Sequence, residues 1–192
     1  MVVHNKFHLE KLILVRLRFI FSILTFLLLS AGCMAQAVTA DPVNGLVKWI
    51  PLEKAMELNK KTPKPILLDF YTDWCGWCKH MMKTTYSEPD LAQYINNYFY
   101  PVKFNAEGKD TIEFLGKMYK PTSAAPKAPH ELAVKLLNGS LSYPSTIFMN
   151  GYDAEKNEFR LNMLAAGYLD RQKIEPMLVF TLENVFRNSE YN

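Results

Sequence analysis

The residues best suited to chemistry are two cysteines three positions apart, Cys75 and Cys78, within the run WCGWCK at residues 74–79. Two cysteines at this spacing can close a small, reversible disulfide when a helix begins at the first of them. Free backbone N–H groups and the helix dipole then favour an anion, which lowers a thiol pKa from roughly 8.5 toward about 7 and yields the nucleophilic thiolate. The spacing therefore predicts thiol–disulfide exchange.

Metal binding and a purely structural disulfide remain alternative uses of the same pair. Structural zinc normally needs four ligands, and the chain has no second CxxC. No His directly follows the second cysteine, so the c-type haem signature is absent. Copper held by two thiolates stays open. We expect Met81 and Met82 to be helix core rather than copper ligands, and His80 and His130 to be surface residues.

The hydrophobic pattern before and after the cysteines predicts the elements that position them. The apolar run between two prolines indicates a buried strand at residues 66–71, and a helix should begin near Cys75. The other elements expected in this half are a strand at 46–50, a helix at 51–60, a helix after Pro89 and a strand at 99–105.

The second half of the chain is expected to complete a mixed sheet. We predict helical turns at 112–118, an exposed Pro/Ala-rich loop at 121–129, a helix at 131–137, strands at 146–149 and 161–166 joined by a turn at Asn150-Gly151, and a last helix capped by Asp170. This order predicts an α/β fold, a central mixed β-sheet flanked by helices on both faces.

Composition limits the classes of protein that the chain can belong to. Its 192 residues suffice for one domain, and 49% hydrophobic with 21% charged residues indicates a globular body. Of 22 Lys/Arg and 19 Asp/Glu, four and one fall in residues 1–35, which leaves 18 of each. A body without excess positive charge does not favour nucleic-acid binding.

The N-terminus has the pattern of a signal peptide. A basic stretch precedes 13 uncharged residues at 19–31, which is short for a membrane span, and small residues follow. We expect a signal peptide at 1–35, a linker at 36–45 and one domain at 46–192. Cleavage near Ala35 or Ala37 is one route. Lipidation of Cys33 and a retained anchor are the others, and all three export the body to the bacterial periplasm.

Three segments together resemble the thioredoxin superfamily. LDFYTDWCGWCK at 68–79 is similar to its active-site strand and helix, YPST at 143–146 to its cis-proline loop, and Gly167 to its late glycine. The nearest branch is that of secreted bacterial thioredoxin-like proteins related to the C-terminal domain of the thiol:disulfide interchange reductase. The resemblance implies a thioredoxin fold over about residues 46–188.

The resemblance also implies catalytic roles for three residues. Cys75 matches the attacking nucleophile, and Cys78 matches the resolving cysteine that releases the mixed disulfide. Asp69 matches a buried carboxylate that accepts the proton of the resolving thiol. Its apolar neighbours would raise its pKa by desolvation, which suits that task near neutral pH. The alternative for Asp69 is a solvated residue at a strand end.

Five more residues are expected to contact the substrate: Trp74, Gly76, Trp77, Tyr143 and Pro144. Pro144 matches the cis-proline beside which an extended substrate segment pairs, and the alternative is a trans proline in a loop. Gly-Trp stands between the cysteines where thioredoxin has Gly-Pro, and Tyr143 is bulkier than usual. These two departures leave substrate choice and redox potential open.

The sequence thus predicts an extracytoplasmic thiol–disulfide oxidoreductase acting on protein cysteines. We expect it to act as a reductant, because Trp77 stands where strong periplasmic oxidants carry a His. It should need no cofactor and no metal. Its expected partners are protein thiols and disulfides and a membrane-bound electron donor, with the chain itself a monomer. A periplasmic copper-binding or metallochaperone module and a non-catalytic thioredoxin-like adaptor are the competing hypotheses.

Overall fold

The computed structural model describes residues 45–153 and 155–189. The expected signal peptide with Cys33, and the expected linker apart from Gly45, lie outside the described residues. In the described part of the chain, none of the helices combines the length and the apolar character needed to cross a bilayer.

A four-stranded mixed sheet forms the centre of the fold, in the order β2-β1-β5-β6. Its strands are β1 (Ile66–Tyr71), β2 (Tyr100–Asn105), β5 (Ser145–Asp153) and β6 (Glu158–Ala166). β1 runs parallel to β2 and antiparallel to β5, and β5 runs antiparallel to β6. The predicted mixed sheet is therefore confirmed.

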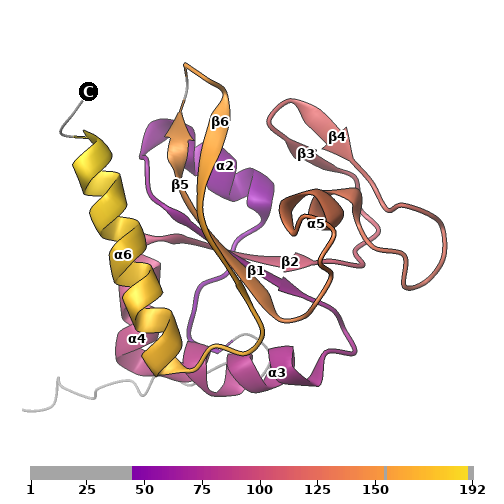
Figure 1. Cartoon of the computed structure of the whole chain (residues 1–192), viewed down its shortest axis with the longest axis horizontal. Helices are drawn as coiled ribbons and strands as arrows, with labels where there is room; N and C mark the ends of the chain where they lie inside the picture. The colour runs from indigo at the N-terminus through magenta and orange to yellow at the C-terminus, as the bar shows by residue number, and fades with distance from the viewer. Residues whose placement is uncertain (1–44, 154, 190–192) are drawn as a thin grey trace, which may run out of the picture. The chain divides into compact units, whose positions relative to one another are not determined.

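Helices cover both faces of this sheet (Figure 1). One face packs against α3 (Gly76–Lys83), the 3₁₀ helix η1 (Thr85–Ser87), α4 (Pro89–Tyr98) and α6 (Arg171–Ser189). The other packs against α2 (Leu52–Lys61), α5 (Glu131–Leu136) and a small hairpin of β3 (Ile112–Phe114) and β4 (Lys117–Tyr119). The layers agree with the thioredoxin-like arrangement expected from the sequence.

The alternation of side chains along β1 decides which residue faces the cysteine-bearing helix. Ile66, Leu68 and Phe70 join the core on the α2 and α5 side, while Leu67 joins the core on the α3, α4 and α6 side. Because successive side chains in a strand point to opposite faces, Asp69 shares the face of Leu67. β1 thus directs one carboxyl toward the side of the sheet that carries α3.

The predicted strand at 46–50 is wrong. Only Ile50 bridges β2, at Val102. The backbone N–H of Leu46 instead donates to the carbonyl of Tyr86 at 2.7 Å. The segment therefore satisfies its backbone groups partly on η1, which hydrophobic alternation does not reveal.

The predicted helical turns at 112–118 are also wrong, because this segment forms the β3–β4 hairpin. Its two-residue turn consists of Leu115 and Gly116, at φ of 54° and 76°. Two consecutive positive φ values are what a tight hairpin of this type requires. A short apolar run does not distinguish helix from strand by periodicity, so the pairing was decided by the turn.

The turn between β5 and β6 lies later than predicted. β5 continues through Asn150 and Gly151 to Asp153, and its register with β6 shifts at this point. The side chain of Asn162 on β6 donates a hydrogen bond to that of Asn150. The dipeptide thus forms an irregularity within the paired strands, while the predicted antiparallel pairing itself is confirmed.

The remaining predicted elements agree with the structure within one to three residues at their ends. The Pro/Ala-rich segment at 121–129 forms neither helix nor strand. Asp170 caps α6, since its Oδ1 accepts the N–H of Lys173 at 3.0 Å. That acceptance satisfies one of the free N–H groups in the first turn of the helix.

Candidate active site

The cysteine pair lies at the start of α3. Cys75 is the N-cap residue, and its Sγ is bonded to that of Cys78 at 2.05 Å, with the two Cα atoms 5.3 Å apart. The backbone N–H of Cys78 also donates to Sγ of Cys75 at 3.1 Å. Each cysteine is 3% exposed. The sulfur of Cys75 therefore lies where the helix end offers an N–H group to a thiolate.

A hydrogen bond and core packing hold α3 in place. At its start, the N–H of Cys75 donates to the carbonyl of Thr72 at 3.1 Å, where the chain turns from β1 into α3. Met81 and Met82 lie in the core, at 0% and 2% exposure, as predicted. They pack the second half of the helix against the sheet face that carries Leu67.

Trp74 stands exposed beside the pair, with 57% of its surface accessible. Its indole N–H donates to both carboxylate oxygens of Glu107, at 3.1 and 3.0 Å. Lys127 Nζ lies 5.7 Å from the centre of a Trp74 ring, and the Tyr143 ring lies edge-on at 6.3 Å. Glu107, Lys127 and Tyr143 thus contact the indole, while more than half of the surface of Trp74 remains exposed to solvent.

Trp77 is 62% exposed and belongs to a second aromatic cluster. Its ring lies 5.5 Å from that of Tyr168 and 5.6 Å from that of His80. Tyr168 is tied to Thr84 by a hydroxyl–hydroxyl hydrogen bond of 3.1 Å. The two tryptophans therefore contact different sets of residues, and the ring of each packs against other aromatic side chains.

The segment around Pro144 approaches the site through Tyr143, whose ring contacts that of Trp74. The Tyr143–Pro144 peptide bond is cis. The carbonyl of Pro144 accepts the N–H of Gly167 at 2.8 Å, which anchors the segment to the end of β6. Gly76 is open, since a Cβ there would meet nothing within 4 Å.

Asp69 is completely buried, which excludes the solvated alternative. Its Oδ1 accepts hydrogen bonds from Tyr86 Oη and Thr146 Oγ1, each at 3.3 Å. Burial raises the pKa of this carboxyl to about 7, and the two hydrogen bonds and the charge of Lys103 oppose the rise. A group with that pKa can both take and release a proton near neutral pH.

The expectation that His130 is a surface residue is wrong. Its side chain is 1% exposed, Nδ1 accepts the N–H of Leu132 at 3.2 Å, and Nε2 is hydrogen-bonded to the carbonyl of Asp110. It caps α5, a use that residue spacing did not reveal. His80 is exposed, as predicted. Within residues 45–153 and 155–189, no three His, Cys, Asp or Glu side chains gather into a metal site.

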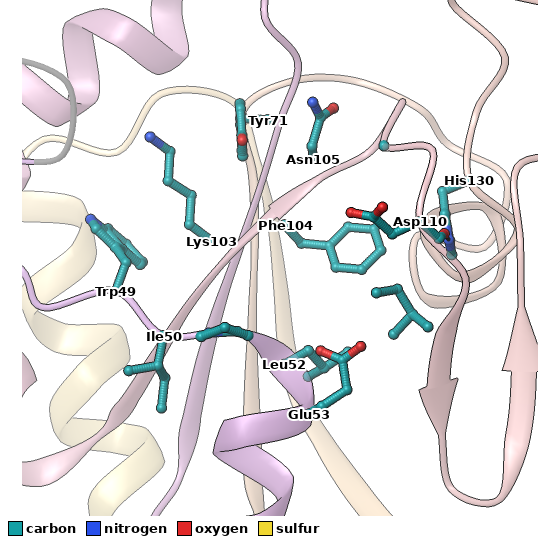
Figure 2. A pocket seen from close by; sticks show the side chains of 13 residues that line it. Trp49, Ile50, Leu52, Glu53, Tyr71, Lys103, Phe104, Asn105, Asp110 and His130 are labelled. Carbon is teal, nitrogen blue, oxygen red and sulfur yellow. Dashed lines mark hydrogen bonds between the residues drawn. The ribbon is translucent and has the colours of Figure 1, made fainter.

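A separate cavity of about 360 Å³ opens between the start of α2 and the end of β2. Figure 2 shows Trp49 and Lys103 at one end of it and Asp110 and His130 at the other. Neither cysteine lines it. The reactive pair thus lies outside this cavity.

Several residues that contact the predicted site residues were not found from the sequence: Tyr86 and Thr146 beside Asp69, Glu107 and Lys127 beside Trp74, and Tyr168 beside Trp77. Thr146 could have been found from strand pairing, because it lies opposite Asp69 in the β1–β5 register. The others come from loops and helix ends that carry no recognisable spacing. The structure brings Cys75, Cys78, Trp74 and Tyr143 together at one helix end, and their roles stay predictions.

A thioredoxin fold with a CxxC pair at the helix following its central strand defines the class of thiol–disulfide oxidoreductases. The sequence model of one family, Thioredox_DsbH, described as "Protein of unknown function, DUF255", matches residues 35–155. The chain belongs to this family, which confirms the thioredoxin-superfamily resemblance.

Similar proteins agree with this assignment. The chain is 25% identical over 107 residues to the thiol:disulfide interchange protein DsbD of Klebsiella pneumoniae, covering 56% of this chain and 14% of that protein. It is 33% identical over 61 residues to DsbD of Pectobacterium atrosepticum, covering 30% and 11%. The chain thus spans a small part of these relatives. A thioredoxin from Thermus thermophilus shares the fold, with a TM-score of 0.55, 15% identity and coverage of 72% of this chain and 89% of that one.

Proposed function

We propose that the chain reduces disulfides in other proteins outside the cytoplasm, through Cys75 and Cys78. The observation that carries the proposal is a disulfide-bonded cysteine pair at the start of α3. The helix packs on the same sheet face as Asp69, a buried carboxyl with a pKa of about 7. The similarity to thiol:disulfide interchange proteins supports the same chemistry.

The proposed reaction moves two electrons to the partner. The reduced Cys75 thiolate attacks one sulfur of a partner disulfide, so that a mixed disulfide forms and one partner thiolate leaves. Cys78 then gives its thiol proton to Asp69 and attacks Cys75 Sγ. The second partner thiolate leaves, the Cys75–Cys78 disulfide forms, and the partner thiolates take up protons.

The helix end supports Cys75 as the attacking residue. Its sulfur accepts a backbone N–H in the oxidised state, and that group remains to stabilise a thiolate after reduction. We propose that Trp74, Gly76, Trp77, Tyr143 and Pro144 form the substrate-binding surface. The exposed tryptophans would bind apolar side chains that flank the partner's cysteine.

Steady reduction outside the cytoplasm requires a supply of electrons. We propose a membrane-bound dithiol donor that reduces the Cys75–Cys78 disulfide after each cycle. We further propose export by the signal peptide at 1–35, followed by cleavage, by lipidation at Cys33 or by retention as an anchor. Mass measurement of the chain from a cell envelope distinguishes these three outcomes. We also propose that the chain acts as a monomer.

Insulin reduction with a dithiol donor tests the proposal. The wild-type chain should turn over, Cys75→Ser should be inactive, and Cys78→Ser should accumulate mixed disulfides with partner proteins. Lys60→Ala is the matched control, since Lys60 is exposed on α2, on the sheet face opposite α3, and its change should leave turnover unchanged. Stoichiometric, tight Cu(I) binding without turnover would replace the proposal with the metallochaperone hypothesis. Full activity in Cys75→Ser would exclude the role given to that cysteine.

A further inference from the structure

The carboxyl of Asp69 is held asymmetrically. Its Oδ1 accepts two hydrogen bonds, from Tyr86 and Thr146, while Oδ2 has no partner among the described residues. All three side chains are fully buried. A carboxyl held in this way has one oxygen stabilised as an acceptor and one oxygen left to carry a proton.

We propose that Tyr86 is a positioning residue, whose hydroxyl, together with that of Thr146, holds one oxygen of Asp69 as an acceptor and leaves the other as the proton site. Tyr86 does not touch the reacting sulfurs in this scheme, and it acts through Asp69. Its hydroxyl thereby sets the pH at which Asp69 exchanges its proton.

The physical basis is a balance between burial and hydrogen bonding. Burial disfavours the carboxylate, whereas a donor to the carboxylate favours it. The hydrogen bond from Tyr86 lowers the pKa of Asp69 against the larger effect of burial. Loss of that donor should therefore raise the pKa. A hydrogen bond of 3.3 Å lies at the weak end of its kind, so the expected rise is about one pH unit.

Other titratable groups surround Asp69 from several elements. Lys103 on β2 is its register partner and favours ionisation, and Tyr71 lies two residues along β1 on the same face. Cys75, the N-cap of α3, and Cys78 in its first turn are joined in a disulfide, so neither has an ionisable thiol in this state. A Tyr86→Phe change alters none of these groups, and it deletes one oxygen atom.

The ring of Tyr86 is fixed independently of its hydroxyl. The Trp49 ring contacts it edge-on at 4.8 Å, and the backbone carbonyl of Tyr86 accepts the N–H of Leu46. The side chain has no exposed surface. Tyr86→Phe should therefore keep the ring in place and fold as the wild type does.

The closing experiment measures the Asp69 carboxyl directly, by ¹³C NMR titration of the full chain with its disulfide closed. Tyr86→Phe should shift the Asp69 midpoint upward by about one pH unit. Tyr100→Phe is the matched control, because its hydroxyl donates to the carbonyl of Thr62 and not to Asp69. An unshifted midpoint in Tyr86→Phe, or an equal shift in Tyr100→Phe, would overturn the assignment.

A second readout rests on the proposed thiol–disulfide exchange. The pH profile of insulin reduction should move upward in Tyr86→Phe, and should not move further when that change is added to Asp69→Asn. If the carboxyl midpoint shifts but the rate profile does not, the proton-accepting role of Asp69 fails while the assignment of Tyr86 stands. The two failures are therefore distinguishable.

Discussion

Replacing Asp69 with Asn should change how the stability of this protein depends on pH. Burial raises the pKa of the Asp69 carboxyl from 3.8 to about 7. Above about pH 5 the unfolded chain has this carboxyl ionised, while the folded chain keeps the proton until about pH 7. The folded state therefore binds more protons in this window, and the free energy of unfolding falls as pH rises.

The size of the effect follows from the same pKa. One proton released on unfolding corresponds to about 1.4 kcal/mol per pH unit. Between about pH 5 and about pH 8, the wild type should therefore lose about 2–3 kcal/mol relative to Asp69→Asn, which stays neutral throughout. The other carboxyls, including those whose pKa is lowered by ion pairs, are the same in both proteins and cancel in the comparison.

Urea unfolding of the disulfide-bonded proteins, followed by far-UV circular dichroism, measures this difference. The free energy of unfolding of the wild type, taken relative to that of Asp69→Asn, should fall steadily from pH 5 to pH 8. Parallel pH dependences would refute the burial argument. A wild type that gains stability relative to the variant would reverse its sign.

Three further changes test other parts of the structure. Leu68→Ala should destabilise the fold by about 2–5 kcal/mol in urea unfolding, because its side chain is fully buried in β1, while Leu164→Ala, at an exposed position, should change stability by less than about 0.5 kcal/mol. Arg171→Ala should produce a small loss of stability that disappears in high salt, because Arg171 forms exposed ion pairs with three carboxylates. Glu107→Ala should raise the KM for insulin about two- to threefold with kcat unchanged, because the indole N–H of Trp74 loses the carboxylate that holds the ring in place. An unchanged KM would show that this contact does not support substrate binding.

The sequence determined the elements whose signals are local. The apolar run between prolines predicted β1 with its observed ends. The spacing of Cys75 and Cys78 predicted that the pair lies at the start of a helix, which is where the structure places it. The order of elements was enough for the mixed sheet with helices on both faces. These features depend on side chains near one another in the chain, so their pattern is readable before folding.

The tertiary structure decided the contacts between distant residues and the path of ambiguous segments. Tyr86 and Thr146 lie 17 and 77 positions from Asp69 and meet it only because η1 and β5 pack beside β1. His130 is buried because it lies at the start of α5 and its ring packs against Phe104 of β2, a contact between residues distant in the sequence. Strand register and packing between layers create such environments, and neither has a period along the chain. The cysteines could thus be found from the sequence, while the surroundings that set the protonation of Asp69 were decided by the fold.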